Sequence, residues 1–279
     1  MIIYRHWFLF FNKNKYHYEI DKRSKLDLFD YENLSKSIPF FPTHPLKDAN
    51  YYGHYYWLKK FSNTRFFDHS IEHGLYIGSH IPKASFLNST KAILTFSDNR
   101  KNHLTQGGIK VPVFPVGPYI HYCDSLLNPS ELKKIKSELG TTLTIFPSHT
   151  SSGFNSRINE NDLMNEIERI RKKLKIENVI ACLYYQDIQK GNLVNTFLSM
   201  GYKITTAGHR YDHNFLARLK SIILISDYTM SNSIGTHLGY CVYLNKPHYI
   251  YKQKVIYKDN SGNNSIEYRT FEELETMEV

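Results

Sequence analysis

The chain has 279 residues, of which 41% are hydrophobic, so it can bury one large core or two small ones, and a disordered protein is excluded. Its 35 Lys and Arg residues outnumber 26 Asp and Glu residues, and the formal net charge of +9 favours an anionic partner such as a phosphorylated substrate or an acidic bilayer. The basic residues are spread along the chain without a nucleic-acid-binding signature, so nucleic acid is not an expected partner.

The first half of the chain has an irregular pattern. Residues 1–11 are apolar, but the stretch is short and carries Arg5 and His6, so it predicts a buried strand rather than a signal peptide or a membrane span. The following segments predict short βα units, with a helix over 55–61, a strand over 65–70, a strand over 92–96, a helix over 99–106 and a strand over 111–116. A polar stretch then marks a boundary, so we expect one domain over residues 1–125 and a second over 126–279.

The second half alternates β-branched runs with amphipathic stretches, which is typical of a parallel sheet covered by helices. Asn128, Pro129 and Glu131 predict a capped helix start, and Gly140 predicts its end. The elements expected after it are strands over 142–146, 179–184, 203–206 and 222–225, and helices over 163–174, 193–200, 215–220 and 238–244. The tail beyond Ile256 is expected to be irregular until a final helix. The fold class is therefore α/β, with two Rossmann-like halves and a cleft between them.

A run of small polar residues in the second half follows a buried strand and precedes an apolar helix. It contains Ser231, Asn232, Ser233 and Thr236. Such a turn leaves free backbone N–H groups at the positive end of the helix, and these bind phosphate without a lysine. Ordinary helix capping is the simpler explanation in isolation. The position at the carboxyl end of a strand, where ligands of open α/β folds bind, favours the phosphate interpretation.

Two other predicted strand ends carry residues that suit a nucleotide. Ser148 and His149 follow one strand, and we expect His149 to hydrogen-bond a donor phosphate. His209 and Arg210 follow another, where the guanidinium suits a phosphate or a base and Asp212 suits a ribose hydroxyl. The alternatives are a solvated loop histidine and a surface turn.

Transfer of a group to a hydroxyl needs a proton acceptor, and the first half offers one at Glu72 and His73, just before Gly74. Adjacent residues in an extended strand point in opposite directions, so either side chain can serve alone. Asp68 and His69 are weaker candidates, and a structural histidine is the alternative for His73. No metal-ligand spacing, GxGxxG motif or P-loop is present, so we expect metal-independent chemistry without a cofactor.

At these residues the chain resembles GT-B glycosyltransferases of bacterial surface-polysaccharide synthesis. Pro147-Ser148-His149 and Ser231-Asn232-Ser233 look like the histidine and serine motifs that hold the CMP part of the donor in bacterial sialyltransferases, polysialyltransferases and Kdo transferases. Those families have proline after the histidine, whereas here Pro147 precedes His149, so UDP and GDP sugars stay open as donors. The resemblance covers residues 68–250 and implies an acceptor-binding first half and a donor-binding second half.

The sequence therefore predicts an enzyme that moves a sugar from a nucleotide-activated donor to a glycan or lipid-linked acceptor. The His73-Gly74 pair also resembles CDP-glycerol and polyol-phosphate transferases of teichoic-acid-like polymer synthesis, which is the first alternative. A non-catalytic nucleotide- or sugar-binding protein is the second. The three cysteines form no CxxC pair, so we expect a cytoplasmic protein, with peripheral contact at the inner membrane face through basic side chains.

Overall fold

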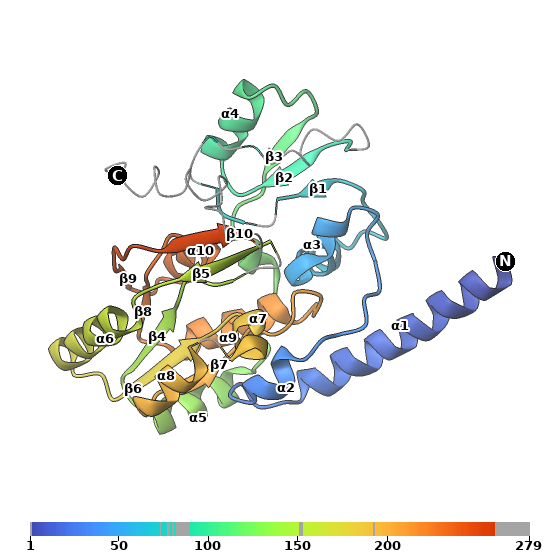
Figure 1. The fold of residues 1–279 in the computed structure, drawn as a ribbon. Helices are drawn as coiled ribbons and strands as arrows, with labels where there is room; N and C mark the ends of the chain where they lie inside the picture. Colours follow the sequence, from blue (N-terminus) through green and yellow to red (C-terminus); the bar gives the residue numbers. More distant parts are fainter. Residues whose placement is uncertain are drawn as a thin grey trace.

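The protein contains two parallel sheets with helices packed around them (Figure 1). The structure is a computed structural model that describes residues 2–72, 74–76, 79, 81, 90–150, 153–191 and 193–259. The predicted fold class, α/β with two Rossmann-like halves, is confirmed. The larger sheet belongs to the second half of the chain and the smaller sheet to the first.

The larger sheet has five strands in the order β7-β6-β4-β8-β9, and every neighbouring pair is parallel. All five residues of the central strand are buried, as expected for a parallel strand covered on both faces. The strands are β4 (Thr142–Phe146), β6 (Asn178–Cys182), β7 (Lys203–Thr205), β8 (Tyr228–Ser231) and β9 (His248–Ile250). The helices of this half are α5 (Pro129–Leu139), α6 (Glu160–Leu174), α7 (Tyr185–Lys190), α8 (Val194–Ser199), α9 (Phe215–Ile225) and α10 (Thr236–Tyr243).

The predicted capped start of α5 is confirmed in atomic detail. The Asn128 side chain accepts a hydrogen bond from the Glu131 backbone N–H at 3.0 Å, and the Glu131 carboxylate accepts one from the Asn128 backbone N–H at 2.8 Å. These bonds satisfy two backbone donors that a helix start otherwise leaves free. The helix therefore begins where the sequence predicts it.

The smaller sheet has three parallel strands, β1 (Ser70–Ile71), β2 (Ile93–Thr95) and β3 (Val113–Pro115), in that order. Helix α4 (Asp98–Gln106) packs against it over a small core made by Ile93, Leu104, Ile109 and Val113. Helix α3 (His54–Phe61) lies between this sheet and the larger half. Of the predicted strand over residues 65–70, only the last residue is in a strand. Ser70 and Ile71 form β1, and both pair with β2.

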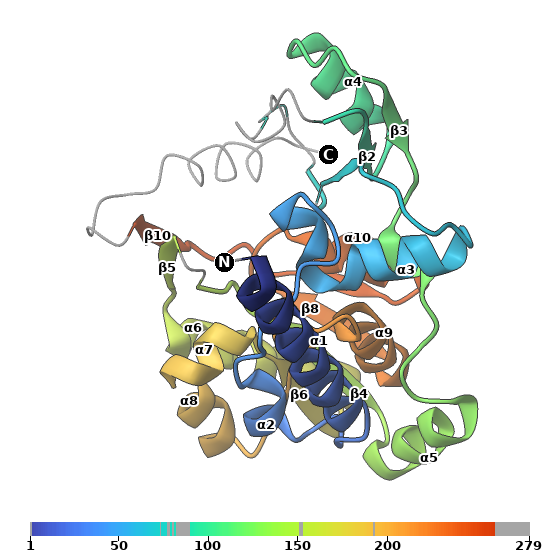
Figure 2. The ribbon, with the colours of Figure 1, turned by 90° about the vertical axis from the view of Figure 1, so that its right-hand side faces the viewer.

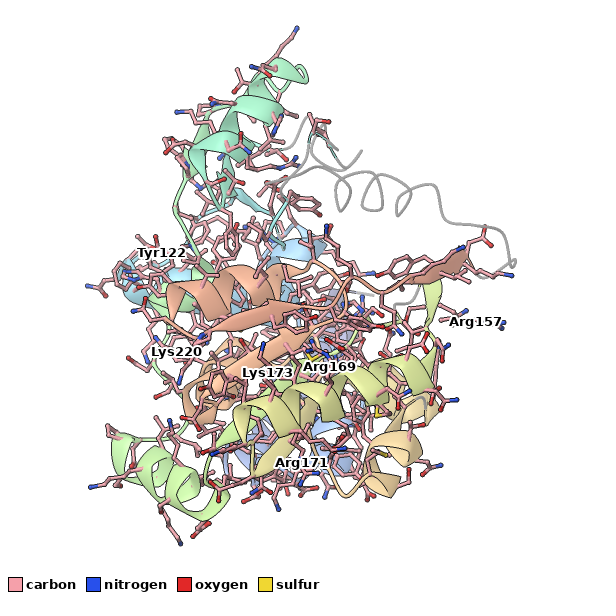
Figure 3. All side chains as sticks on the ribbon, turned by 90° about the vertical axis from the view of Figure 1, so that its left-hand side faces the viewer. Tyr122, Arg157, Arg169, Arg171, Lys173 and Lys220 are labelled. Carbon is pink, nitrogen blue, oxygen red and sulfur yellow. The ribbon has the colours of Figure 1, made fainter. Side chains whose placement is uncertain are left out.

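The chain segment that crosses between the two halves is tied to α9. The Lys220 ammonium donates to the backbone carbonyls of Ile120 at 3.2 Å and Cys123 at 2.6 Å. Lys220 is labelled in Figure 3. The Ser221 hydroxyl accepts from the Leu127 N–H at 3.0 Å. These bonds hold the crossing segment against the larger half.

The predicted buried strand over residues 1–11 is wrong, because these residues begin helix α1 (Ile2–Ser24). A short apolar run alone does not distinguish a strand from a helix, whereas the burial of Tyr16, Ile20 and Arg23 at helical spacing does. The carboxyl half of α1 packs on the second half of the chain, where the Arg218 guanidinium donates to the Arg23 carbonyl at 3.3 Å. The amino half projects away from the body (Figures 1 and 2).

Two further predictions for the second half are corrected. The expected helix over 215–220 and strand over 222–225 form the single helix α9, whose burial on most sides removes the polar face that marks a surface helix. The start of the tail, expected to be irregular, forms β10 (Ile256–Asp259), which pairs antiparallel with β5 (Phe154–Arg157). The expected final helix from Phe271 lies outside the described residues.

Helix α9 carries a fully buried ion pair. The Arg218 guanidinium and the Asp212 carboxylate are 2.9 Å apart, and neither side chain is exposed. We predict that Arg218→Met lowers the free energy of unfolding by about 3 to 5 kcal/mol, because it leaves a buried carboxylate without its partner. The matched control Lys25→Met removes an exposed pair with Asp21 and should change it by about 0.5 kcal/mol or less. Urea denaturation measures both, and equal losses would contradict the prediction.

Candidate functional site

A cavity of about 320 Å³ lies at the carboxyl ends of the larger sheet's strands and is also lined by the first half. This volume is in the range of small-molecule sites, and the place is the one where open α/β sheets bind ligands. The first half contributes Tyr52, His54, Gly74, Leu75 and Tyr76. The second half contributes residues that follow β4, β6, β7 and β8, together with parts of α9 and α10.

The predicted turn between β8 and α10 forms one wall of this cavity. Ser233, Gly235 and Thr236 line it, and α10 begins at Thr236. The Thr236 hydroxyl accepts a hydrogen bond from the Leu75 backbone N–H at 3.0 Å. This bond links the amino end of α10 to the first half, so the two halves meet at this wall of the cavity.

Ser231, the last residue of β8, and Asn232, the first residue of the turn, make structural contacts. The Asn232 side chain is 1% exposed, accepts from the Ser148 N–H at 2.6 Å and donates to Gln253 at 2.9 Å. The Ser231 hydroxyl is buried at 2.9 Å from the His248 ring nitrogen Nε2. Neither residue is among those that line the cavity, and Asn232 instead holds the β4 and β8 loops together.

The loop after β4 places the other predicted pair in the cavity wall, because Ser148 and His149 both line it. The His149 ring stacks on Tyr184, with centroids 4.5 Å apart and planes at 26°. The Tyr184 hydroxyl lies 3.3 Å from that of Tyr52 in the first half. Burial raises the pKa of Tyr184 well above its ordinary value, so this aromatic wall presents neutral hydroxyls.

Of the residues after β7, Thr206 and Ala207 line the cavity, whereas His209 and Arg210 are not part of its lining. The Arg210 guanidinium donates to the Tyr185 hydroxyl at 2.7 Å and lies over the Tyr51 ring. Burial and two nearby arginines lower the pKa of His209 to about 4, so its ring is neutral near pH 7. Asp212, interpreted from sequence as a ribose ligand, is instead buried against Arg218. Binding by His209 and Arg210 stays a prediction.

Of the two candidate general bases, His73 is not among the described residues and Glu72 is. Glu72 is 6% exposed and does not line the cavity. Its carboxylate pairs with the fully buried Arg100 at 2.7 Å and accepts from the Thr95 hydroxyl at 2.6 Å. The Arg100 guanidinium in turn lies over the ring of the cavity residue Tyr76. Glu72 is thus part of a buried ion pair, and its role as a base stays a prediction.

Sequence reasoning missed several cavity residues. Tyr184 follows β6 as His149 follows β4, so the rule that found His149 also points to it. His237 and Tyr240 lie on α10, beyond the polar turn, where an apolar helix gives no signal. Tyr52 reaches the cavity from a segment with a positive φ of 58°, which the sequence pattern does not indicate.

The described part of the chain holds neither a cluster of metal ligands nor a membrane-spanning helix. No three His, Cys, Asp or Glu side chains there lie close enough together to hold a metal ion. No helix there combines the length and the apolar composition needed to cross a bilayer.

Comparison with known proteins gives a weak similarity of fold. No family model and no curated protein matches the chain. Two structures of UDP-GlcNAc 2-epimerase from Methanocaldococcus jannaschii, each 13% identical in sequence, cover 68% of this chain. The structure in complex with UDP-GlcNAc and UDP has a TM-score of 0.34, and the other has 0.31. The chain spans 62% and 63% of these proteins' lengths.

Proposed function

We propose that the chain is a glycosyltransferase that binds a nucleotide-activated sugar in the cavity between its halves. The observation that carries this proposal is the meeting of Ser148 and His149 with the amino end of α10 in one cavity wall. A helix start offers backbone N–H groups and a positive dipole to a phosphate, and the polar side chains beside it add hydrogen bonds.

The aromatic part of the cavity suits the rest of a nucleotide. Tyr184, His149 and Tyr52 bring flat apolar faces together, and aromatic faces stack well on nucleobases. Leu75 and Tyr76 line the same cavity from the first half, so an acceptor held by that half would meet the donor there. This arrangement supports transfer from a donor on one half to an acceptor on the other.

The alternative of a CDP-polyol phosphotransferase also fits the cavity, because Gly74 of the His73-Gly74 pair lines it. A Cβ at this position would lie 3.2 Å from the Thr236 hydroxyl, so glycine allows the close approach of the two halves. Release of UDP, GDP or CDP would identify a sugar transferase, whereas CMP is common to both reactions. Turnover with any donor would dismiss a non-catalytic binding protein.

The first test concerns the phosphate. We predict that His149→Ala weakens nucleotide affinity by about 1.5 to 3 kcal/mol, the usual contribution of a hydrogen bond to a charged group. Isothermal titration with UDP, GDP, CMP and CDP measures this. His121→Ala, which alters an exposed histidine outside the cavity, is the matched control and should bind as the wild type does. Unchanged affinity in His149→Ala would show that His149 is an ordinary loop residue that does not bind the phosphate.

The second test separates the two candidate bases. We predict that His73→Ala lowers turnover about 100- to 10,000-fold with an unchanged melting temperature, as expected for a general base. Glu72→Ala should instead lower the melting temperature, because it removes the carboxylate from a buried ion pair with Arg100. Thermal unfolding and initial rates measure the two effects. Full turnover by His73→Ala would place the base elsewhere, with Asp68 and His69 the next to replace.

Peripheral membrane contact is part of the same proposal, and α1 is the element that favours it. Of the ten residues 2–11 in its projecting half, eight are apolar or aromatic. Ten helical residues span about 15 Å, or half of a hydrocarbon core, so this length suits insertion into one leaflet. Lys13 and Lys15 follow it with exposed side chains. The arginines of α6 lie on another side of the molecule (Figure 3), where Arg169 and Arg171 pair with acidic neighbours.

The third test is sedimentation with lipid vesicles. We predict that the protein sediments with anionic phosphatidylglycerol vesicles at low salt and is released at high salt, because each basic residue near such a surface contributes about 1 kcal/mol. The double variant Lys13→Gln, Lys15→Gln should bind less than the control Lys133→Gln, Lys134→Gln on α5. Protein that stays in the supernatant at low salt would contradict membrane contact.

A further inference from the structure

The cavity lining includes one residue of the ribbon that β5 and β10 form together, and this residue is Tyr257. The ribbon projects from the larger half of the molecule (Figures 2 and 3). Tyr257 is half-buried, so part of its surface stays accessible. A ligand in the cavity can therefore reach a residue that comes from outside the two parallel sheets.

The pairing of the ribbon shows which of its faces Tyr257 occupies. Successive residues of a strand point to opposite faces, and the preceding residue, Ile256, is 40% exposed and does not line the cavity. Tyr257 lies directly opposite Ser156, and opposite residues of an antiparallel pair share a face. The Ser156 hydroxyl donates to the carbonyl of the cavity residue Ser148 at 3.4 Å. The face shared by Tyr257 and Ser156 is therefore the one that meets the cavity wall.

The ribbon is also tied to the two loops that carry the proposed phosphate site. The Ser156 N–H donates to the Thr150 hydroxyl at 3.4 Å, in the loop after β4. Four residues before Tyr257, the Gln253 side chain accepts from the buried Asn232 amide at 2.9 Å, in the loop after β8. These bonds hold the two strands of the ribbon against the wall where we place the phosphate.

The other aromatic wall of the cavity comes from a different part of the sheet. Tyr184, whose ring stacks on His149, follows β6, which lies on one side of β4. The segment that leads to Tyr257 follows β9, and β9 lies on the other side of β4. Elements on both sides of the β4 loop thus supply an aromatic side chain to one cavity. A nucleotide sugar has the matching form, because its phosphates join two ring systems, the nucleoside and the sugar.

We infer that Tyr257 is a ligand-binding residue whose ring packs on a ring of the nucleotide sugar. Aromatic side chains stack on nucleobases and also present an apolar face to the C–H groups of a sugar, so a ring face is the chemistry that both partners share. This inference rests on the proposed function and deepens it. It assigns the β5–β10 ribbon to the binding site and adds a residue that holds the ligand beside its phosphates.

The two faces of β10 offer matched variants. Tyr257→Ala removes the ring that faces the cavity, and Tyr257→Phe retains the ring without the hydroxyl. Ile256→Ala shortens the neighbouring side chain on the opposite face and is the control. Thermal unfolding without ligand identifies any variant that does not fold.

Titration calorimetry with UDP-N-acetylglucosamine, GDP-mannose and CMP-sialic acid, and with UDP, GDP and CMP, measures the affinities. Tyr257→Ala should weaken binding of the nucleotide sugar about 5- to 100-fold, as expected for the loss of an aromatic stack. Tyr257→Phe and Ile256→Ala should stay within about 3-fold of the wild type. An equal loss for the free nucleotide would identify the base as the partner of the ring, and a loss confined to the nucleotide sugar would identify the sugar.

Several outcomes would overturn the inference and leave the proposed function standing. They are unchanged affinity in Tyr257→Ala, or an equal loss in Tyr257→Phe or in Ile256→Ala. Hydrogen exchange of the wild type tests the same contact without a variant, because a bound nucleotide sugar should slow exchange in residues 256–259. Unchanged exchange there, with slower exchange in residues 146–149, would also overturn it. If the wild type binds none of these ligands, the proposed function is wrong and the inference falls with it.

Discussion

The geometry of a parallel sheet is the constraint on which the rest of the structure depends. Parallel strands end at one edge, so β4 and β8 bring the loops after Phe146 and Ser231 together although 84 residues separate Ser148 from Asn232. The buried Asn232 amide then fixes the spacing of the two loops by bonding to both Ser148 and Gln253. Next to the bond between Asn232 and Ser148, Ser148 and Ser233 lie on the cavity wall.

Much of the second half is predictable from local signals. The strand over 142–146 has a glycine before it, a β-branched run and a proline after it, and the structure has the same bounds. The sequence divides α9 into a helix and a strand, because burial removes the polar face from which helical periodicity is recognised. The start of α1 is not recognisable from sequence because residues 1–11 are mostly apolar, and the helical register becomes visible only where Tyr16 and Ile20 pack in a core cluster.

The candidate site was predictable only in part, for a physical reason. Strand ends locate the loops that surround a cavity, but the partner of each side chain decides whether it faces the ligand. Ser231 turns to His248 and Glu72 turns to Arg100, and nothing local in the sequence indicates these pairings. His237 faces the cavity because Gly235 leaves room for its ring. Such contacts join distant residues or depend on side-chain direction, so they appear only in three dimensions.

The central claim is that one cavity, shared by the two halves, holds a nucleotide sugar with its phosphates at the amino end of α10. The most direct measurement is a crystal structure of the protein grown with UDP-N-acetylglucosamine, GDP-mannose or CMP-sialic acid. The account predicts density for phosphate beside His149 and Ser233. A nucleotide bound outside this cavity, or one with its phosphates away from the amino end of α10, would contradict it.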